Sequence, residues 1–218
     1  MKTDIIIADD HPLFRKAVIA TLENSENNYV IIGEASNGEE LVNLIENNKP
    51  DLVLLDLSLP KKNGYEVLKW IHHKRKEIKT LVISAFDDDV SIRKTINEGA
   101  NGYLTKSAKG EDILLAIQNI IEHGFYFTEK THLALVNKLK TNTSLFDNMP
   151  PTKIELDDRE IKMIQMYSEG QTNFEIAEQL FISPRTVETI RQHMVKKAGV
   201  KNIIGLILFA IKNGIINV

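Results

Sequence analysis

The first 123 residues alternate five short apolar runs with five segments of helical periodicity, and this alternation restricts the fold more than any other feature. The runs have strand length and are apolar at nearly every position, which is typical of strands buried on both faces. They occupy Ile5–Ala8, Tyr29–Gly33, Leu52–Leu55, Thr80–Ile83 and Gly102–Leu104. The helical segments occupy Leu13–Leu22, Glu39–Glu46, Tyr65–Lys74, Val90–Glu98 and Glu111–Glu122. The pattern predicts a doubly wound, parallel α/β sheet.

Polar side chains stand at the carboxyl ends of these predicted strands. Asp9 and Asp10 follow the first run, Asp56 follows the third, Ser84 follows the fourth, and Lys106 comes shortly after the fifth. In an open parallel sheet the ligand crevice lies outside the strand ends, at the point where the strand order reverses. We therefore expect these five residues to converge on one pocket.

Such a pocket has a definite chemistry. Carboxylates that are brought together repel one another, and Mg²⁺ relieves the repulsion while leaving coordination positions for phosphate oxygens. A carboxylate so placed can attack a phosphoryl group and form an acyl phosphate, and a lysine ammonium can neutralise the phosphoryl oxygens. The other interpretation is that Asp9, Asp10 and Asp56 cap helix N-termini. Their coincidence with Ser84 and Lys106 on successive strands favours the pocket.

The same residues belong to longer stretches that resemble a known family. Residues 1–123 are similar to the receiver domain of a two-component response regulator, which has a flavodoxin-like fold. The matching stretches are Ala8-Asp9-Asp10-His11, Asp56-Leu57-Ser58-Leu59-Pro60 followed by Gly64, Ser84-Ala85, and Gly102-Tyr103-Leu104-Thr105-Lys106.

This resemblance implies a role for each matching residue. The implied residues are Asp56 as phospho-acceptor; Asp9, Asp10, Asp56 and the Ser58 backbone carbonyl as magnesium ligands; and Ser84, Tyr103 and Lys106 as phosphoryl-binding and switch residues. Ser84 would donate its hydroxyl to a phosphoryl oxygen and draw its loop inward, and Tyr103 would rotate inward to fill the vacated space. His11 is interpreted as a helix-entry residue before Pro12 rather than a metal ligand.

From Lys153 onward the pattern is wholly helical. The helix start signals are two capping boxes and one N-cap before proline: Asp157 with Glu160, Thr172 with Glu175, and Ser183 with Pro184. They predict a small all-α domain of four short helices over residues 153–218. Residues 125–152 hold polar turn formers, a proline pair and one short helical pattern at Lys130–Leu139. We expect domains at 1–124 and 153–218 with 125–152 as their linker.

The predicted helix Pro184–Ala198 has two distinct faces. Its inward stripe is Val187, Ile190, Met194 and Ala198, its opposite face is Arg185, Thr189, Gln192 and Lys196, and Glu188 lies on the flank. A face of long hydrogen-bonding side chains suits a major-groove recognition helix, and an ordinary solvated face is the alternative. The preceding helix and short turn complete a helix–turn–helix, which favours DNA binding.

Residues 154–202 resemble the LuxR/NarL-type DNA-binding domain of response regulators. The matching stretches are Leu156–Glu160, Glu169–Ala177, Leu180–Val187 and Lys197–Val200. The resemblance implies DNA contact from Glu188, Thr189 and Gln192. We expect affinity for DNA to depend on Arg185, Lys196 and Lys201. Many relatives carry lysine where this chain has Glu188. A glutamate cannot neutralise a phosphate, although it can accept a hydrogen bond from cytosine N4.

Composition narrows the possible functions further. The chain has no cysteine, which excludes disulfides, thiolate zinc sites and cysteine nucleophiles. No apolar run reaches the length of a membrane span, and the N-terminus lacks the features of a signal peptide, so we expect a cytoplasmic protein without a membrane partner. From Phe181 onward six Lys and Arg residues accompany Glu188 as the sole acid. This local excess of positive charge favours a polyanionic partner.

Together these features predict a DNA-binding response regulator and not an enzyme. A sensor histidine kinase would phosphorylate Asp56 in the presence of Mg²⁺, and the phosphorylated homodimer would bind two half-sites of double-stranded DNA. One alternative is an aspartyl-phosphate phosphatase of the haloacid-dehalogenase kind, in which a second aspartate stands where this chain has Ser58. The other is a receiver that acts by protein contact without phosphorylation.

Overall fold

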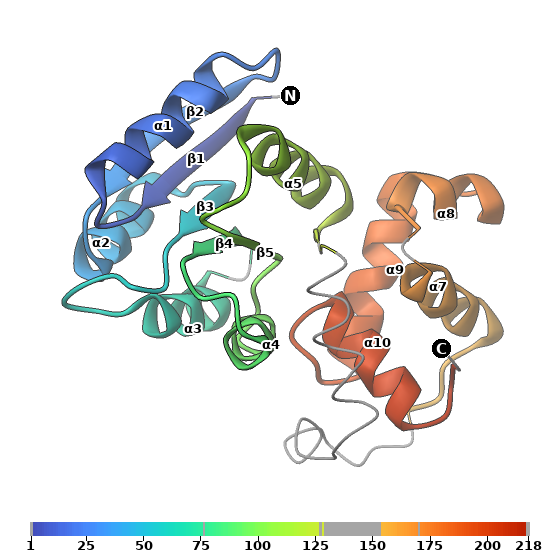
Figure 1. The fold of residues 1–218 in the computed structure, drawn as a ribbon. Coiled ribbons are helices and arrows are strands. Elements are labelled where there is room, and N and C mark those ends of the chain that lie inside the picture. Colours follow the sequence, from blue (N-terminus) through green and yellow to red (C-terminus); the bar gives the residue numbers. More distant parts are fainter. Residues whose placement is uncertain (1, 76, 127, 129–153, 170, 217–218) are drawn as a thin grey trace. The chain divides into compact units, whose positions relative to one another are not determined.

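The computed structural model describes residues 2–75, 77–126, 128, 154–169 and 171–216. The chain divides after residue 132 into two compact units (Figure 1). The helix predicted at Lys130–Leu139 lies outside the described residues. The predicted domain limits, after residues 124 and 152, stay predictions.

The strands of the first unit form one parallel sheet in the order β2-β1-β3-β4-β5. The strands are β1 (Thr3–Ala8), β2 (Tyr29–Ala35), β3 (Leu52–Leu55), β4 (Lys79–Ser84) and β5 (Gly102–Thr105). The chain steps from β1 to β2 on one side and then returns to place β3 on the other side of β1. The strand order therefore reverses at β1, and the doubly wound fold predicted from the apolar runs is confirmed.

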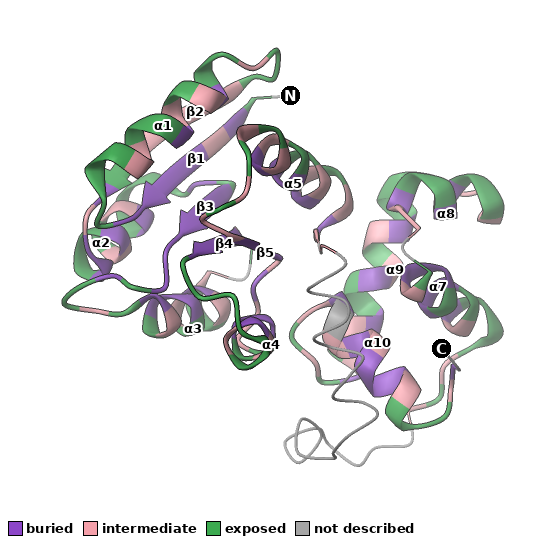
Figure 2. Cartoon of the chain, in the orientation of Figure 1, coloured by how far each residue is buried: buried purple, intermediate pink, exposed green. Residues whose placement is uncertain are grey.

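Helices cover both faces of this sheet (Figure 1). On one face lie α1 (Pro12–Glu23) and α5 (Gly110–His123), and on the other lie α2 (Gly38–Asn48), α3 (Gly64–Lys74) and α4 (Asp89–Asn97). All residues of β3 and nearly all of β1 and β4 are buried (Figure 2). Burial on both faces explains why these strands are apolar at nearly every position instead of alternating.

The start of α3 packs closely against the chain that follows β3. The N–H of Gly64 donates to the Leu57 carbonyl at 3.0 Å. A Cβ at Gly64 would lie 2.3 Å from the Asp56 carbonyl oxygen, far inside van der Waals contact. Asn63 and Glu66 form a capping box that fixes the first turn of the helix. Glycine is therefore required here for α3 to approach Asp56.

All regular secondary structure in the described residues of the second unit is helical. Its helices are α7 (Asp158–Ser168), α8 (Asn173–Leu180), α9 (Pro184–Lys197) and α10 (Ile203–Lys212). All three predicted start signals are confirmed as N-caps: Asp157 accepts from the Glu160 N–H, Thr172 from the Glu175 N–H, and Ser183 from the Thr186 N–H. Each cap satisfies a backbone N–H that has no partner inside the helix.

The core of the second unit is built around α10. Leu206, Phe209 and Ala210 of this helix are fully buried, together with Met163 from α7 and Met194 from α9. None of the helices in the described part of the chain has the length and apolarity needed to cross a membrane.

Candidate functional site

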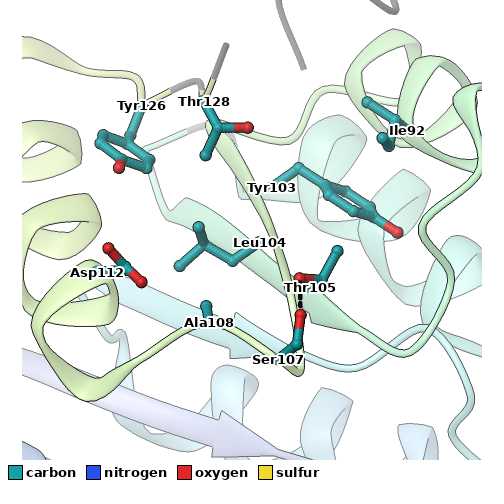
Figure 3. A pocket seen from close by; sticks show the side chains of 9 residues that line it. All are labelled: Ile92, Tyr103, Leu104, Thr105, Ser107, Ala108, Asp112, Tyr126 and Thr128. Carbon is teal, nitrogen blue, oxygen red and sulfur yellow. Dashed lines mark hydrogen bonds between the residues drawn. The ribbon is translucent and has the colours of Figure 1, made fainter. Parts of the chain in front are cut away.

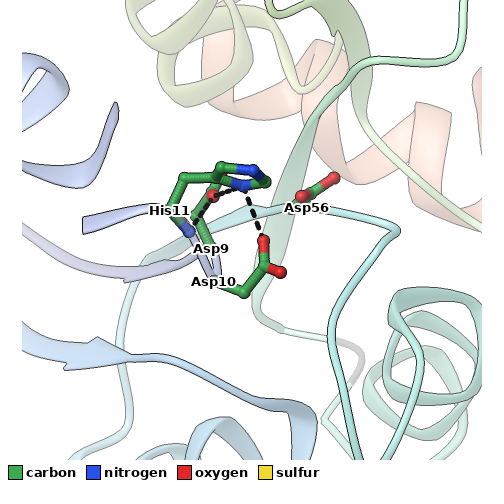
Figure 4. A group of neighbouring side chains, drawn as sticks. All are labelled: Asp9, Asp10, His11 and Asp56. Carbon is green, nitrogen blue, oxygen red and sulfur yellow. Dashed lines mark hydrogen bonds and ion pairs between the residues drawn. The ribbon is translucent and has the colours of Figure 1, made fainter. Parts of the chain in front are cut away.

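The carboxyl ends of β1 and β3 bring the predicted acidic residues together. These strands are neighbours, Asp9 and Asp10 directly follow β1, and Asp56 directly follows β3. The Asp56 N–H donates to the last carbonyl of β1 at 2.9 Å. One potential ligand atom from each of Asp9, Asp10, His11 and Asp56 lies within 4.8 Å of the others, and Figure 4 shows the four side chains gathered at this edge.

Lys106 places its ammonium between the two buried carboxylates. Its Nζ lies 2.7 Å from Asp9 Oδ2 and 2.8 Å from Asp56 Oδ2. The backbone N–H of Lys106 donates to the Ser84 carbonyl at 2.8 Å, which holds the loop after β5 against the end of β4. Burial disfavours the charged ammonium, but the hydrogen bonds that it donates to Asp56 and Asp9, together with their negative charge, outweigh burial and raise the pKa of Lys106.

The burial of this cluster is uneven. Asp56 is 1% exposed and Asp9 is 2% exposed, whereas the side chain of Asp10 is 36% exposed. The side of Asp10 and His11 is therefore open to solvent, and the Asp9 and Asp56 carboxylates form the floor of the site. Ser58 donates its backbone N–H to Asp56 Oδ1 at 3.2 Å, which orients that carboxylate.

Oxygen donors dominate the cluster, and this donor set fits Mg²⁺. Asp9, Asp10 and Asp56 supply carboxylates, which are the ligands that hard cations prefer. The Lys106 ammonium supplies positive charge to the buried carboxylates of Asp9 and Asp56. The Ser58 carbonyl as a further ligand stays a prediction.

Two residues take part in the site in ways that the sequence pattern did not indicate. His11 is the N-cap residue of α1, as expected, and its Nδ1 also lies 2.7 Å from Asp10 Oδ1 and 3.3 Å from Asp9 Oδ1. Arg15 donates to the Asp9 carbonyl at 2.6 Å and to Glu34 Oε2 at 3.2 Å. Arg15 therefore ties the end of β1 to β2. Its position one turn into an amphipathic helix carries no signal of this contact.

The two predicted switch residues lie next to the acidic cluster. Ser84 is fully buried at the end of β4, and its Oγ accepts the Phe86 N–H at 3.3 Å. Tyr103 of β5 is 1% exposed, and its hydroxyl donates to the Phe86 carbonyl at 2.5 Å. Burial raises the pKa of the Tyr103 hydroxyl. Tyr103 thus already points inward, and both residues hold the loop that links β4 to α4.

Tyr103 also forms one wall of a cavity of about 220 Å³. In Figure 3 the ring of Tyr103 lies on the Ile92 side of this cavity, and its hydroxyl points away from Asp112 and Tyr126. The other lining residues are Leu104, Thr105, Ser107, Ala108 and Thr128. A rotation of Tyr103 would therefore change the shape of a surface between α4 and α5.

In the second unit, α9 presents the predicted polar face to solvent. Arg185, Thr189, Gln192 and Lys196 are all exposed, and Glu188 is half-buried on the flank. The Thr189 hydroxyl donates to the Arg185 carbonyl at 2.9 Å, so its methyl group is left for outside contacts.

The inward stripe of α9 departs from prediction at one position. Val187, Met194 and Ala198 are buried as expected, but Ile190 is only half-buried. Arg191 is 9% exposed and fills the remaining inward position. The sequence pattern missed Arg191 because a charged residue is buried only when it is paired, and the pattern does not show the pairing.

Comparison with known families gives an independent result. Residues 5–118 match the family described as "Response regulator receiver domain", and residues 155–210 match "Bacterial regulatory proteins, luxR family". The chain belongs to the LuxR-type response regulators. It is 34% identical to "Oxygen regulatory protein NreC" of Staphylococcus aureus (strain JH9), over 95% of this chain and 96% of that protein.

Solved structures show the same architecture. A LuxR-family response regulator from Aurantimonas sp. SI85-9A1 is 25% identical with a TM-score of 0.58, over 64% of this chain and 99% of that one. The receiver domain of the putative response regulator NarL from Mycobacterium tuberculosis is 32% identical with a TM-score of 0.51, over 54% and 94%. RcsB in a complex with DNA is 22% identical with a TM-score of 0.57, over 96% and 98%, and shares the fold.

Family membership settles the class of function. The protein is a DNA-binding response regulator of a two-component system, and it regulates transcription through a helix–turn–helix domain. Its fold is a receiver-type α/β sheet with a small all-α domain, as the sequence predicted.

Proposed function

We propose that phosphorylation of Asp56 by a sensor histidine kinase, with Mg²⁺ bound, switches DNA binding by this regulator. The observation that carries the proposal is the convergence of Asp56, Asp9, Asp10 and Lys106 from separate strand ends. This arrangement combines a nucleophilic carboxylate, acidic metal ligands and a cation in one site, which are the parts that phosphoryl transfer needs.

The proposed reaction transfers a phosphoryl group from a phosphohistidine to Asp56. A carboxylate oxygen of Asp56 attacks the phosphorus, a new O–P bond forms, and the P–N bond to the histidine breaks. The electron pair of that bond stays on the imidazole nitrogen, and the product is an acyl phosphate. The Ser58 N–H, 3.2 Å from Asp56 Oδ1, keeps the attacking carboxylate oriented.

Neutralising the transferred group is the task of the surrounding residues. Asp9, Asp10, Asp56 and the Ser58 carbonyl would hold Mg²⁺, which when bound neutralises negative charge on the phosphoryl oxygens. Lys106 is already 2.8 Å from Asp56 Oδ2, and we propose that its ammonium follows the negative charge onto the phosphoryl group.

The switch would act through the loop after β4. Ser84 would turn its hydroxyl from the Phe86 N–H to a phosphoryl oxygen and shift the loop toward Asp56. Tyr103 holds the same loop through the Phe86 carbonyl. Tyr103 is already buried. We therefore propose that its side chain exchanges between inward and outward conformers, and that phosphorylation raises the population of the inward one.

DNA recognition would fall to α9. Arg185, Thr189, Gln192 and Lys196 share an exposed face of this helix, which is the shape and chemistry of a major-groove reader. RcsB, which shares the fold, has been solved as dimers on DNA. We propose that phosphorylation likewise favours a homodimer that binds two half-sites on double-stranded DNA. We place this activity in the cytoplasm, where a transcription regulator meets its DNA.

The test is to treat the full chain with a small acyl phosphate, with and without Mg²⁺, and to follow intact mass and DNA affinity. We expect the mass of one phosphoryl group to be added only with Mg²⁺, and DNA affinity to change with it. Asp56→Asn should gain no phosphoryl group while keeping its circular dichroism spectrum. Phosphorylation that persists in Asp56→Asn would contradict the proposal.

Two outcomes separate the alternatives. In a second assay, a phosphatase would turn over generic phosphomonoesters and release phosphate continuously, whereas we expect no such turnover and at most one phosphoryl group per chain. A receiver acting by protein contact alone would take no phosphoryl group under any of these conditions.

A further inference from the structure

Glu188 is the one acidic side chain on the predicted DNA-reading helix, and it is held by four donors of its own domain. Its carboxylate accepts from both Arg191 Nε and Arg191 Nη2 in a bidentate pair. It also accepts from Gln192 Nε2 at 2.8 Å and from Asn173 Nδ2 at 3.1 Å. Side-chain exposure is 31% for Glu188 and 11% for Arg191, so the pair is largely withdrawn from solvent.

The contact with Asn173 extends this network across three helices. Asn173 is the first residue of α8 and is 3% exposed. Its Oδ1 accepts from the Tyr167 hydroxyl of α7 at 2.6 Å, and its Nδ2 donates to Glu188 Oε2 of α9. The chain of bonds from Tyr167 through Asn173 to Glu188 therefore fixes α9 against both α7 and α8.

The number of acceptor positions on the Glu188 carboxylate limits whether it can also bind a DNA base. An ionised carboxylate offers about four lone-pair sites, and the four donors from Arg191, Gln192 and Asn173 fill them. Burial disfavours the charged carboxylate, but Arg191 outweighs it and keeps the pKa of Glu188 below its usual value. A cytosine N4 donor would have to displace one of these bonds, so base reading by Glu188 is disfavoured.

The contact with Glu188 holds the Gln192 amide in place and leaves part of it available for hydrogen bonds to DNA. Gln192 is exposed on the outward face, and only one of its two amide N–H groups is given to Glu188. The amide keeps one N–H donor and its carbonyl acceptor, and a donor with an acceptor is the pair that matches adenine N7 and N6 in the major groove.

We infer that Glu188 is a positioning residue that aligns the Gln192 amide, and that Gln192 reads an adenine in each half-site. This inference rests on the proposed role of α9 in DNA recognition. Holding one N–H of Gln192 in place reduces the number of conformers that the side chain loses on binding DNA.

The test is selection of bound DNA from a random-sequence pool by the full chain, with Mg²⁺ and a small acyl phosphate. The variants are Gln192→Ala and the double variant Glu188→Ala/Arg191→Met, which removes both charges of the pair so that neither is left buried alone. Lys196→Ala is the matched control, because Lys196 is exposed one turn further along the same face. Circular dichroism checks that each variant is folded.

We expect wild type to select an adenine at one position of the motif. In Gln192→Ala the preference for adenine over other bases at that position should fall about 5- to 150-fold, the range for one bidentate contact. The double variant should weaken preference at that same position only. Lys196→Ala should lower affinity about equally for all sequences and reduce the salt slope by about one. Replacing that adenine by 7-deazaadenine should weaken wild type but not Gln192→Ala, and this reading does not depend on the double variant folding.

Two results would overturn the inference while leaving the proposed function intact. One is a wild-type motif whose adenine preference survives in Gln192→Ala. The other is loss of a cytosine preference in the double variant with the adenine preference unchanged, which would make Glu188 the reader. A wild-type protein that selects no motif at all would contradict DNA recognition by α9 and the inference with it.

Discussion

Replacing Lys106 by methionine should lower the stability of the receiver unit, and bound Mg²⁺ should restore that stability. Lys106 is the cation between Asp9 and Asp56, which are 2% and 1% exposed. Removing one partner of a buried ion pair costs about 3–5 kcal/mol, and we take about 3 kcal/mol because the Lys106 side chain is 18% exposed. For a unit of this size that loss corresponds to a fall in Tm of roughly 10–15 °C.

The single tryptophan makes this measurement specific. Trp70 lies in α3, so its fluorescence during urea unfolding of the full chain follows the receiver unit. Without divalent cations, Lys106→Met should lose about 3 kcal/mol, while Lys16→Met, a change on the exposed surface of α1, should stay within about 0.5 kcal/mol of wild type.

Magnesium and a second substitution then identify the cause. Bound Mg²⁺ at one hundred times its Kd adds about 2.7 kcal/mol, and Lys106→Met should gain more from it than wild type because no ammonium competes. Asp56→Asn in the Lys106→Met background should also restore stability, since it removes one of the two repelling charges. A Lys106→Met protein that unfolds like wild type, or whose stability changes with neither Mg²⁺ nor Asp56→Asn, would contradict this role of Lys106.

Three further perturbations test other parts of the account. Gly64→Ala should force the chain after β3 to move, because the new Cβ would lie 2.3 Å from the Asp56 carbonyl oxygen. We expect acyl phosphate to form more slowly on this variant, as followed by intact mass. An unchanged rate would contradict this expectation. Tyr167→Phe should cost the helical unit about 1–3 kcal/mol, since it leaves the buried Asn173 Oδ1 without its donor; thermal circular dichroism measures the loss, and no loss would contradict the network. The pKa of Glu188 is lowered in the folded state, so its contribution to stability is complete above its unfolded pKa of about 4.3 and is lost as pH falls through the lower folded value. Glu188→Gln should remove that part of the acid unfolding curve, and an identical curve would show that the carboxylate contributes nothing.

The fold was largely predictable because its signals are local. Strands buried on both faces have to be apolar throughout, and the predicted run Leu52–Leu55 matches β3 residue for residue. Capping boxes such as Asp157 with Glu160 act over a single turn, so sequence spacing is enough to find them. The convergence of Asp9 and Asp56 was also predictable, because parallel strands end at one edge of the sheet.

Contacts that depend on side-chain geometry could not be predicted in this way. Arg191 was assigned to neither face of its helix, and it is buried because Glu188, three residues earlier, supplies a bidentate partner. The contacts of Asn173 could not be predicted either, because its hydrogen-bond partners belong to two other helices. Spacing along the chain shows which side chains can approach one another, but it does not show which of them form hydrogen bonds with each other.

Phosphorylation of Asp56 is tested most directly by locating the transferred phosphoryl group. The full chain would be treated with a small acyl phosphate and Mg²⁺, reduced with borohydride to convert any aspartyl phosphate to homoserine, and mapped by tandem mass spectrometry. We expect conversion at Asp56 alone, abolished by chelation of Mg²⁺ and strongly slowed by Lys106→Met. Conversion at another aspartate, or at Asp56 with equal speed in the absence of divalent cations, would contradict that expectation.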